Sequence, residues 1–115
     1  MSGHESTFIR VADTSEIPAG AMKMVKAMGE EILLINSGNA YYAIANRCTH
    51  RRGDLSKGHL EGNIIKCPVH GSKFDVTTGK NVDGPTVLFI KGKTGDLKSY
   101  QLKIVGNAIH IAQKS

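Results

Sequence analysis

Short runs in which apolar and polar residues alternate follow one another along most of the chain. Apolar side chains alternate with polar ones across residues 100–104 and again across residues 109–111, and Gly106 and Asn107 lie between the two runs. A period of two is typical of half-buried strands, and a Gly–Asn pair between two such runs is typical of a tight turn. The C-terminal part of the chain is therefore predicted to form an antiparallel hairpin.

Earlier segments show the same pattern. Residues 22–27 predict a strand, which is preceded by Pro18 and Gly20. Residues 31–35 and 41–45 predict two more strands, which are joined across an Asn-Ser-Gly-Asn turn. No stretch sustains an apolar period of 3.6 residues over three turns, so a long amphipathic helix is not expected. We expect an all-β fold of stacked antiparallel sheets, arranged as a sandwich or barrel.

The middle of the chain is more broken. A short hairpin is predicted around residues 60–65, and turn-forming residues then interrupt the chain repeatedly. These residues are Gly58, Gly71, Gly79, Gly84 and Pro85. The 115 residues have the length of one domain. We expect a single domain over residues 1–115, with a small loop-rich subdomain over about residues 46–86.

Composition and charge narrow the class of protein. The chain is 40% hydrophobic and 22% charged, which is ordinary for a globular domain with a core. It shows no signal-peptide pattern, and its apolar runs are too short to span a membrane, so we expect a soluble, cytoplasmic protein with no membrane partner. A net charge of +5 raises the possibility of nucleic-acid binding. Because no run of five basic residues and no RNA-binding aromatic signature is present, nucleic acid is not an expected partner.

Side chains that can bind a metal gather in two short motifs. Cys48 and His50 form the first motif, and Cys67 and His70 form the second after a gap of sixteen residues. Each motif places a thiol and an imidazole on a loop after a predicted strand, and the hairpin between the motifs can bring the two loops face to face. One disulfide between the cysteines is the simplest alternative, but a reducing cytosol disfavours it.

Two thiols and two imidazoles suit either zinc or an iron–sulfur centre. The common zinc finger of this composition pairs its cysteines in one knuckle and its histidines on a helix. Here each motif is mixed and no helix is predicted, which favours a binuclear cluster, with a zinc-stabilised binding module as the alternative. The remaining histidines, His4, His59 and His110, are expected to be ordinary surface or packed side chains.

The two motifs carry a family resemblance. Their pattern is Cys-x-His, sixteen residues, and then Cys-Pro-x-His-Gly-x-x-Phe-Asp, which resembles the cluster-binding region of Rieske proteins. Further likeness to the small ferredoxin components of aromatic-ring dioxygenases runs along nearly the whole chain. The resemblance implies a Rieske fold with one 2Fe–2S cluster in the loop-rich subdomain. It implies that Cys48 and Cys67 ligate the inner iron, and that His50 and His70 ligate the outer, solvent-facing iron.

The resemblance also indicates which neighbours tune the cluster. The high-potential Rieske proteins of cytochrome bc complexes have a Ser two residues after the second His and a Tyr two residues further on. This chain has Ser72 and Phe74 at these positions. The extra cysteines that form a disulfide in those proteins correspond here to Gly53 and Val69. We therefore expect a potential toward the lower end of the roughly −150 to +300 mV Rieske range.

Two further segments have expected roles near the cluster. Gly84 and Pro85 are expected to belong to the loop that closes over the cluster in this family, because proline holds the backbone rigid without a free N–H. Residues 86–95 depart from the dioxygenase ferredoxins. They are expected to form an added hairpin arm or a partner contact.

The chain shows no motif for a catalytic cofactor. It has no GxGxxG sequence and no P-loop, and it is too short to add the mononuclear iron domain of a Rieske oxygenase. We expect a non-catalytic one-electron carrier that takes electrons from a flavin-dependent reductase and passes them to an oxygenase or another oxidoreductase. The alternative is a Rieske-like small subunit of a larger oxidoreductase such as nitrite reductase.

Basic residues are concentrated around the two motifs. Only Asp54 and Glu61 oppose them between residues 47 and 73. The basic residues are Arg47, Arg51, Arg52, Lys57, Lys66 and Lys73. This excess predicts a basic rim that favours acidic partner surfaces, and a solvated surface with no docking role is the alternative.

Overall fold

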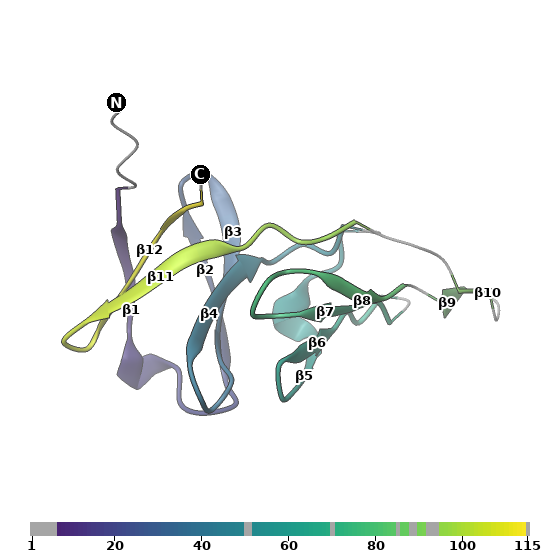
Figure 1. Ribbon diagram of the computed structural model, residues 1–115, viewed down its shortest axis with the longest axis horizontal. Coiled ribbons are helices and arrows are strands. Elements are labelled where there is room, and N and C mark those ends of the chain that lie inside the picture. Colours follow the sequence, from purple (N-terminus) through teal and green to yellow (C-terminus); the bar gives the residue numbers. More distant parts are fainter. Residues whose placement is uncertain are drawn as a thin grey trace.

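The computed structural model describes residues 7–49, 52–69, 71–84, 86–87, 90–91 and 95–114. Within them the chain forms twelve short β-strands and two 3₁₀ helices of three residues each. All described strand pairs are antiparallel, and they form two three-stranded sheets, a four-stranded sheet of shorter strands and a two-stranded pair. In Figure 1 the sheet of shorter strands lies beside the other two sheets. The expectation of an all-β fold of stacked antiparallel sheets is confirmed.

The outer three-stranded sheet joins the two ends of the chain. It contains β1 (Ile9–Asp13), β12 (Ala108–Gln113) and β11 (Tyr100–Val105), in that order. The predicted C-terminal hairpin is present, because β11 and β12 pair from Tyr100 opposite Gln113 to Val105 opposite Ala108. Asp13 then caps the first 3₁₀ helix, η1 (Thr14–Glu16), which leads the chain toward the second sheet.

The second sheet lies in the middle of the molecule. It contains β2 (Met22–Ala27), β3 (Glu30–Asn36) and β4 (Tyr41–Ala45), with β3 in the centre. Successive side chains of a strand point to opposite faces. In β3, Ile32 and Leu34 pack with the outer sheet, whereas Leu33 and Ile35 pack with the segments around the two cysteines. β3 therefore separates two hydrophobic cores, which explains why four consecutive residues in it are fully buried.

The four-stranded sheet is a meander of three-residue strands. The second 3₁₀ helix, η2 (Leu55–Lys57), leads into it. Its strands are β5 (His59–Glu61), β6 (Ile64–Lys66), β7 (Lys73–Asp75) and β8 (Asn81–Asp83), in chain order. Ile65 and Phe74 face the core, so the neighbouring residues along each strand face solvent. The sheet thus has one buried face and one solvent face.

A two-stranded arm follows this sheet. β9 (Thr86–Val87) pairs with β10 (Ile90–Lys91), and Figure 1 shows the pair projecting beyond the small sheet. The pairing agrees with a hairpin arm in the predicted region, and its role as a partner contact stays a prediction. No helix in the described part of the chain is long and apolar enough to cross a membrane.

Candidate metal centre

Both cysteines of the predicted ligand set lie in the core next to the small sheet. Cys48 follows β4 and Cys67 follows β6, and each is 1% exposed. Both are free thiols, so the alternative of a disulfide between them is wrong for this structure. They share a hydrophobic cluster with Phe74, which is fully buried. The structure therefore brings the two cysteines to one side of the central sheet.

Gly53 shows how closely the two cysteine loops approach. A Cβ atom at this position would lie 2.6 Å from Cys67 Sγ and 3.1 Å from Val69 Cγ2. Real Cβ atoms do not come so near to sulfur, so a glycine is required here by the close approach. The prediction that the loops lie face to face is confirmed. Gly53 and Val69, the positions matched to the disulfide of high-potential relatives, are indeed neighbours in space.

Backbone hydrogen bonds hold each cysteine loop in shape. In the first loop, Cys48 N donates to Gly53 O over 2.9 Å and Arg52 N donates to Cys48 O over 2.8 Å. In the second loop, Cys67 N donates to Ser72 O over 2.7 Å. Each loop is thus closed by its own backbone hydrogen bonds, and a loop held in shape in this way loses less entropy when it binds a metal.

The electrostatic environment of Cys67 favours a cation nearby. The pKa of the Cys67 thiol is raised to about 11, mainly by burial and to a smaller extent by the neighbouring Cys48, although the amide of Val69 acts to lower it. That amide donates to Cys67 Sγ over 3.4 Å. A pair of buried thiols is costly to ionise unless positive charge lies beside it, and a metal ion supplies that charge. This donor set fits an iron–sulfur cluster or another thiolate-bound metal.

Ser72 presents a buried hydroxyl with no partner. Its Oγ is inaccessible to solvent and makes no hydrogen bond within the described residues. A buried hydroxyl without a partner costs about 1–3 kcal/mol. Because Ser72 closes the loop of Cys67, an acceptor atom bound between the loops would satisfy it. The sulfur atoms of an iron–sulfur cluster are acceptors of this kind. The described residues therefore fit the predicted cofactor.

The structure describes only some of the other predicted site residues. Phe74 lies in the core on β7, and Gly84 follows β8 and is half-buried. His50, His70 and Pro85 lie outside the described residues, so their roles as ligands and as cluster cover stay predictions. The structure places one thiol from each motif and leaves the two imidazoles to be tested by experiment.

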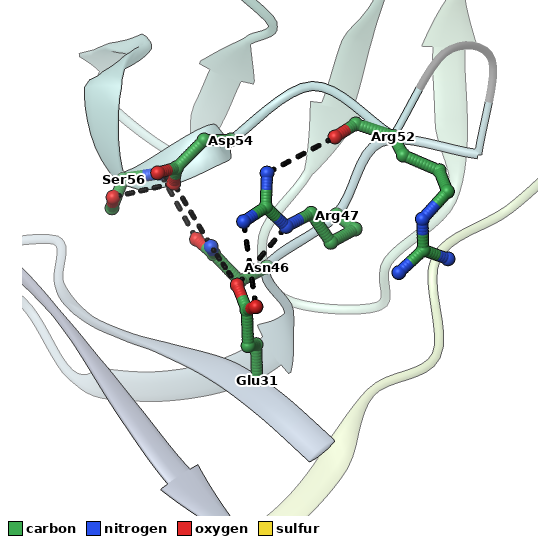
Figure 2. Close-up of polar contacts among 6 residues, drawn as sticks. All are labelled: Glu31, Asn46, Arg47, Arg52, Asp54 and Ser56. Atoms are coloured by element: carbon green, nitrogen blue, oxygen red, sulfur yellow. Dashed lines mark hydrogen bonds and ion pairs between the residues drawn. The ribbon is translucent and has the colours of Figure 1, made fainter.

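A polar network anchors the first cysteine loop, and we did not predict it from the sequence. Figure 2 shows Asn46, which is fully buried, between Glu31 on β3 and Asp54 at the end of the loop. Asn46 Nδ2 donates to Asp54 Oδ1 over 2.9 Å and to Glu31 Oε1 over 3.2 Å. Its Oδ1 accepts from Ser56 N over 3.0 Å. The side chain therefore ties both ends of the loop to the central sheet.

Arg47 completes this network. Its Nε donates to Glu31 Oε1 over 3.0 Å, and its Nη1 donates to the carbonyl of Arg52 over 3.3 Å (Figure 2). Arg52 has a φ of 53°, which is uncommon for a residue with a side chain, so this contact supports a strained turn. Hydrogen bonds from Arg47 and then Asn46 hold the pKa of Glu31 below its usual value.

A sequence signal for the network existed. Asp54 stands two residues before Ser56, and the pair forms an aspartate turn that caps η2, with Ser56 N and Oγ both donating to the carboxylate. These bonds and the one from Asn46 hold the pKa of Asp54 below its usual value. The partner Asn46 could not be inferred, because only the fold brings the end of β4 beside the start of η2.

The predicted basic rim is narrower than expected. Arg47 turns toward Glu31, so its charge is compensated, and Arg51 lies outside the described residues. Lys57, Lys66 and Lys73 line an open groove that also reaches Cys67 and Pro68. Arg52 lies exposed on the first loop, so the described basic charge near the site is divided between Arg52 and the three lysines around the groove.

Comparison with known proteins agrees with this arrangement. The family model of the Rieske 2Fe-2S domain matches residues 7–104. The ferredoxin component of the naphthalene 1,2-dioxygenase/salicylate 5-hydroxylase systems of Ralstonia sp. is 40% identical over 97 residues, which is 84% of this chain and 86% of that protein. The naphthalene 1,2-dioxygenase ferredoxin component of Pseudomonas aeruginosa is 38% identical with the same coverage.

Solved structures show the same fold. The ferredoxin of carbazole 1,9a-dioxygenase from Nocardioides aromaticivorans IC177 has a TM-score of 0.79 at 31% identity, over 95% of this chain and 100% of that chain. A chain of the complex of reduced oxygenase and oxidised ferredoxin in carbazole 1,9a-dioxygenase has a TM-score of 0.82 at 27% identity, over 94% of this chain and 95% of that chain.

Proposed function

Because this chain belongs to the Rieske 2Fe-2S domain family, whose cofactor is a 2Fe–2S cluster, we propose that it is a freestanding ferredoxin that passes single electrons from a reductase to an oxygenase. The relatives are ferredoxin components, which carry electrons and do not themselves catalyse a reaction. The observation that carries the proposal is the contact across the two loops, where Gly53 packs on the sulfur of Cys67 beside a second buried free thiol.

The proposed ligands are Cys48, Cys67, His50 and His70. The bound cluster supplies reversible one-electron chemistry near the protein surface. Each thiol is already buried and free, and each loop is already closed by its own backbone hydrogen bonds. We infer that residues 46–86 form the cluster-binding part of a single domain over residues 1–115, and that Gly84 and Pro85 belong to its cover.

Two hydrogen-bond donors of this chain can stabilise the negative charge that the cluster gains on reduction. The amide of Val69 donates to Cys67 Sγ, and the hydroxyl of Ser72 is buried beside the same loop with its donor unused. Both donors favour the more negative, reduced state and raise the potential. Phe74 has no hydroxyl to add a third donor, which supports a potential toward the lower end of the Rieske range.

The proposed partners follow from the relatives. Those proteins are components of dioxygenase systems, and one similar chain comes from a complex of oxygenase with ferredoxin. We propose a flavin-dependent reductase as donor and an oxygenase as acceptor, both meeting the protein in the cytoplasm. The ferredoxin components among the relatives favour this carrier over a small subunit of nitrite reductase.

A spectroscopic titration tests the proposal. The purified protein should be red-brown, contain two irons and no zinc per chain, and bleach on reduction by dithionite. Cys67→Ser should lose the colour and the iron, whereas His59→Gln, in a histidine outside the proposed ligand set, should keep both. A colourless protein that holds one zinc after expression with added iron would overturn the proposal in favour of a zinc-stabilised module.

A further inference from the structure

The register of the small sheet lines up charged residues in one row. His59 lies opposite Lys66, Lys66 lies opposite Lys73, and Lys73 lies opposite Asp83. Residues directly opposite each other in antiparallel strands share a face, with Cβ atoms about 5 Å apart. The adjacent row contains Ile65 and Phe74 and faces the core. The row of His59, Lys66, Lys73 and Asp83 therefore lies on the solvent face.

A β-bulge completes this row. The pairing of β7 with β8 shifts between Lys73 and Phe74, which brings Asp83 opposite Lys73. Asn81 fixes the bulge, because its Nδ2 donates to Lys73 O over 3.0 Å and to Asp83 O over 2.8 Å. The position of the lysines is thus set by the backbone of the sheet.

The row adjoins the loop of Cys67. Lys57, from η2, joins Lys66 and Lys73 around an open groove that extends to Cys67 and Pro68. A Cβ atom at Gly71 would lie 3.3 Å from Lys66 Cε, so the stem of Lys66 runs along this loop. A partner that contacts the lysines would therefore also lie against the proposed cluster-binding loop.

The three groove lysines differ from those lysines that the structure holds in salt bridges, although Asp83 lies directly opposite Lys73. No ion pair or side-chain hydrogen bond is found for the ammonium groups of Lys57, Lys66 and Lys73 within the described structure. Elsewhere, Lys23 pairs with Glu16 and Lys98 pairs with Glu30. Lys66 stands between Lys73 and His59 and has no acid directly opposite it.

The acids on this face leave a positive excess beside the loop. Asp83 ends the row, and Asp75 accepts from Thr77 N and Oγ1. Glu61 is the third acid, and it lies one row further from the loop, with its side chain 88% exposed. Like charges directly opposite each other destabilise a sheet, so an anion bound over Lys66 and Lys73 would relieve a cost that is present in the free protein.

We propose that this groove is the docking site for an acidic segment of the redox partner, whose Asp or Glu carboxylates pair with Lys57, Lys66 and Lys73. This inference rests on the proposed function and adds the chemistry of the partner surface. The lysines are spread along an open groove across successive strands rather than converging on one point, which suits several carboxylates of a protein surface. The residues that line the groove include no Phe, Tyr or Trp on which a nucleotide base could stack, which disfavours a single-stranded nucleic acid.

Binding of a model acidic peptide tests the groove itself. Isothermal titration calorimetry with hexaglutamate at low salt compares the natural protein with the double variant Lys66→Gln/Lys73→Gln. The matched control is Lys26→Gln/Lys103→Gln, which removes the same net charge from exposed positions on the two three-stranded sheets. We expect at least a five-fold loss of affinity in the first variant and less than a two-fold change in the control.

Electron transfer to small oxidants of opposite charge tests the coupling to the site. The dithionite-reduced protein gives one electron to anionic ferricyanide or to cationic hexaammineruthenium(III), measured by stopped flow. Removing the two groove lysines should slow the ferricyanide reaction by roughly ten-fold at low ionic strength, because local charge steers the encounter. The ruthenium reaction should not slow, and the control variant should change both rates by less than two-fold.

Three results would overturn the proposal: equal losses in the two double variants, no change in either, or tighter binding of a short single-stranded oligonucleotide than of hexaglutamate. These results can be told apart from a failure of the proposed electron-carrier function, because the two proposals are tested by different measurements. A protein without a bleachable cluster would fail the spectroscopic test, while the calorimetry would still report on the groove.

Discussion

The two three-stranded sheets and the four-stranded sheet differ in how their strands and charges are arranged. The former have strands of five to seven residues, and Lys23, Arg47 and Lys98 on or beside them pair with glutamates. The latter has strands of three residues and carries Lys66 directly opposite Lys73, with Asp83 opposite Lys73 at the end of the row and no salt bridge to either lysine among the described residues.

The difference indicates that the two three-stranded sheets form a stable scaffold and that the four-stranded sheet forms part of the proposed binding site. Long strands with two buried cores satisfy their own polar groups and gain stability from burial. The small sheet and its loops keep a buried hydroxyl without a partner among the described residues and two lysines directly opposite each other, and each of these features costs stability. A bound cluster would accept a hydrogen bond from the hydroxyl, and an acidic partner would pair with the lysines. The proposed site therefore lies where polar and charged groups have the fewest partners within the described chain.

Removing the cluster should have the largest effect, because it should destabilise the four-stranded sheet much more than the two three-stranded sheets. Chelation of the iron from the reduced protein is expected to speed amide hydrogen exchange in β5 to β8 by more than roughly ten-fold, because the metal crosslinks the two loops that flank this sheet. Exchange in β3 and β12 should change little. Exchange that accelerates equally in all sheets would show that the small sheet has no special dependence on the cluster.

Substituting Gly53 should have the next largest effect. Gly53→Ala places a methyl group against Cys67 Sγ, so we expect a loss of about 2 kcal/mol in the free energy of unfolding and a fall in bound iron. Gly95→Ala is the matched control, because among the described residues, apart from its chain neighbours, no atom lies within 4 Å of the added methyl group, and its φ is not positive. Denaturant titration and iron analysis check both variants. Equal stability of the two variants would contradict the close approach of the loops.

The anchor of the first loop should respond to pH. The pKa of Asp54 is held below its usual value by hydrogen bonds from Ser56 first and then from Asn46. A carboxyl group with a lowered pKa in the folded state stabilises the protein above its unfolded pKa of about 3.9, and this stabilisation is lost as pH falls through the folded value. Asp54→Asn should cost about 1.5 kcal/mol at pH 7 and flatten the fall in stability below pH 4.

Denaturant titrations between pH 3 and pH 7 measure this effect. Asp96→Asn serves as the control, because the Asp96 carboxylate accepts from the amide of Asn81 and takes no part in the network of Asn46, Asp54 and Ser56. If the Asp54 variant kept the same pH profile as the natural protein, the carboxylate would not be the anchor.

The smallest effect is expected at Ser72. Ser72→Ala removes a donor that favours the reduced state, and a loss of about 1 kcal/mol corresponds to a fall of about 40 mV in a one-electron potential. Ser37→Ala, in the turn between β3 and β4, should leave the potential unchanged. Protein-film voltammetry measures both. An unchanged potential in the Ser72 variant would mean that its hydroxyl does not reach the cluster.

Much of the fold could be predicted from local patterns. The strands β2 and β4 begin and end at the residues predicted from alternation and turn residues, and the C-terminal hairpin turns at Gly106 and Asn107. These features depend on neighbouring residues alone, so a single sequence contains them. The pairing of the two cysteine motifs could also be predicted, because the short hairpin between them leaves few ways to place the loops.

The anchoring network and the reduced extent of the basic rim could not be predicted. Arg47 counted as a positive charge of the rim until the fold brought Glu31 beside it, and Asn46 gains its role from partners eight and fifteen residues away. Such contacts depend on how β3 packs beside the first loop, which local alternation does not specify.

The sequence by itself determined the strand segments, the four candidate ligands and the likeness to Rieske ferredoxins, because these features are set by residue type and spacing. Only the tertiary structure decided that β3 has two buried faces, that Gly53 contacts the sulfur of Cys67, and that Lys66 lies opposite Lys73. Register and packing join residues that are distant along the chain, and a difference of one residue in register would turn the lysine row toward the core.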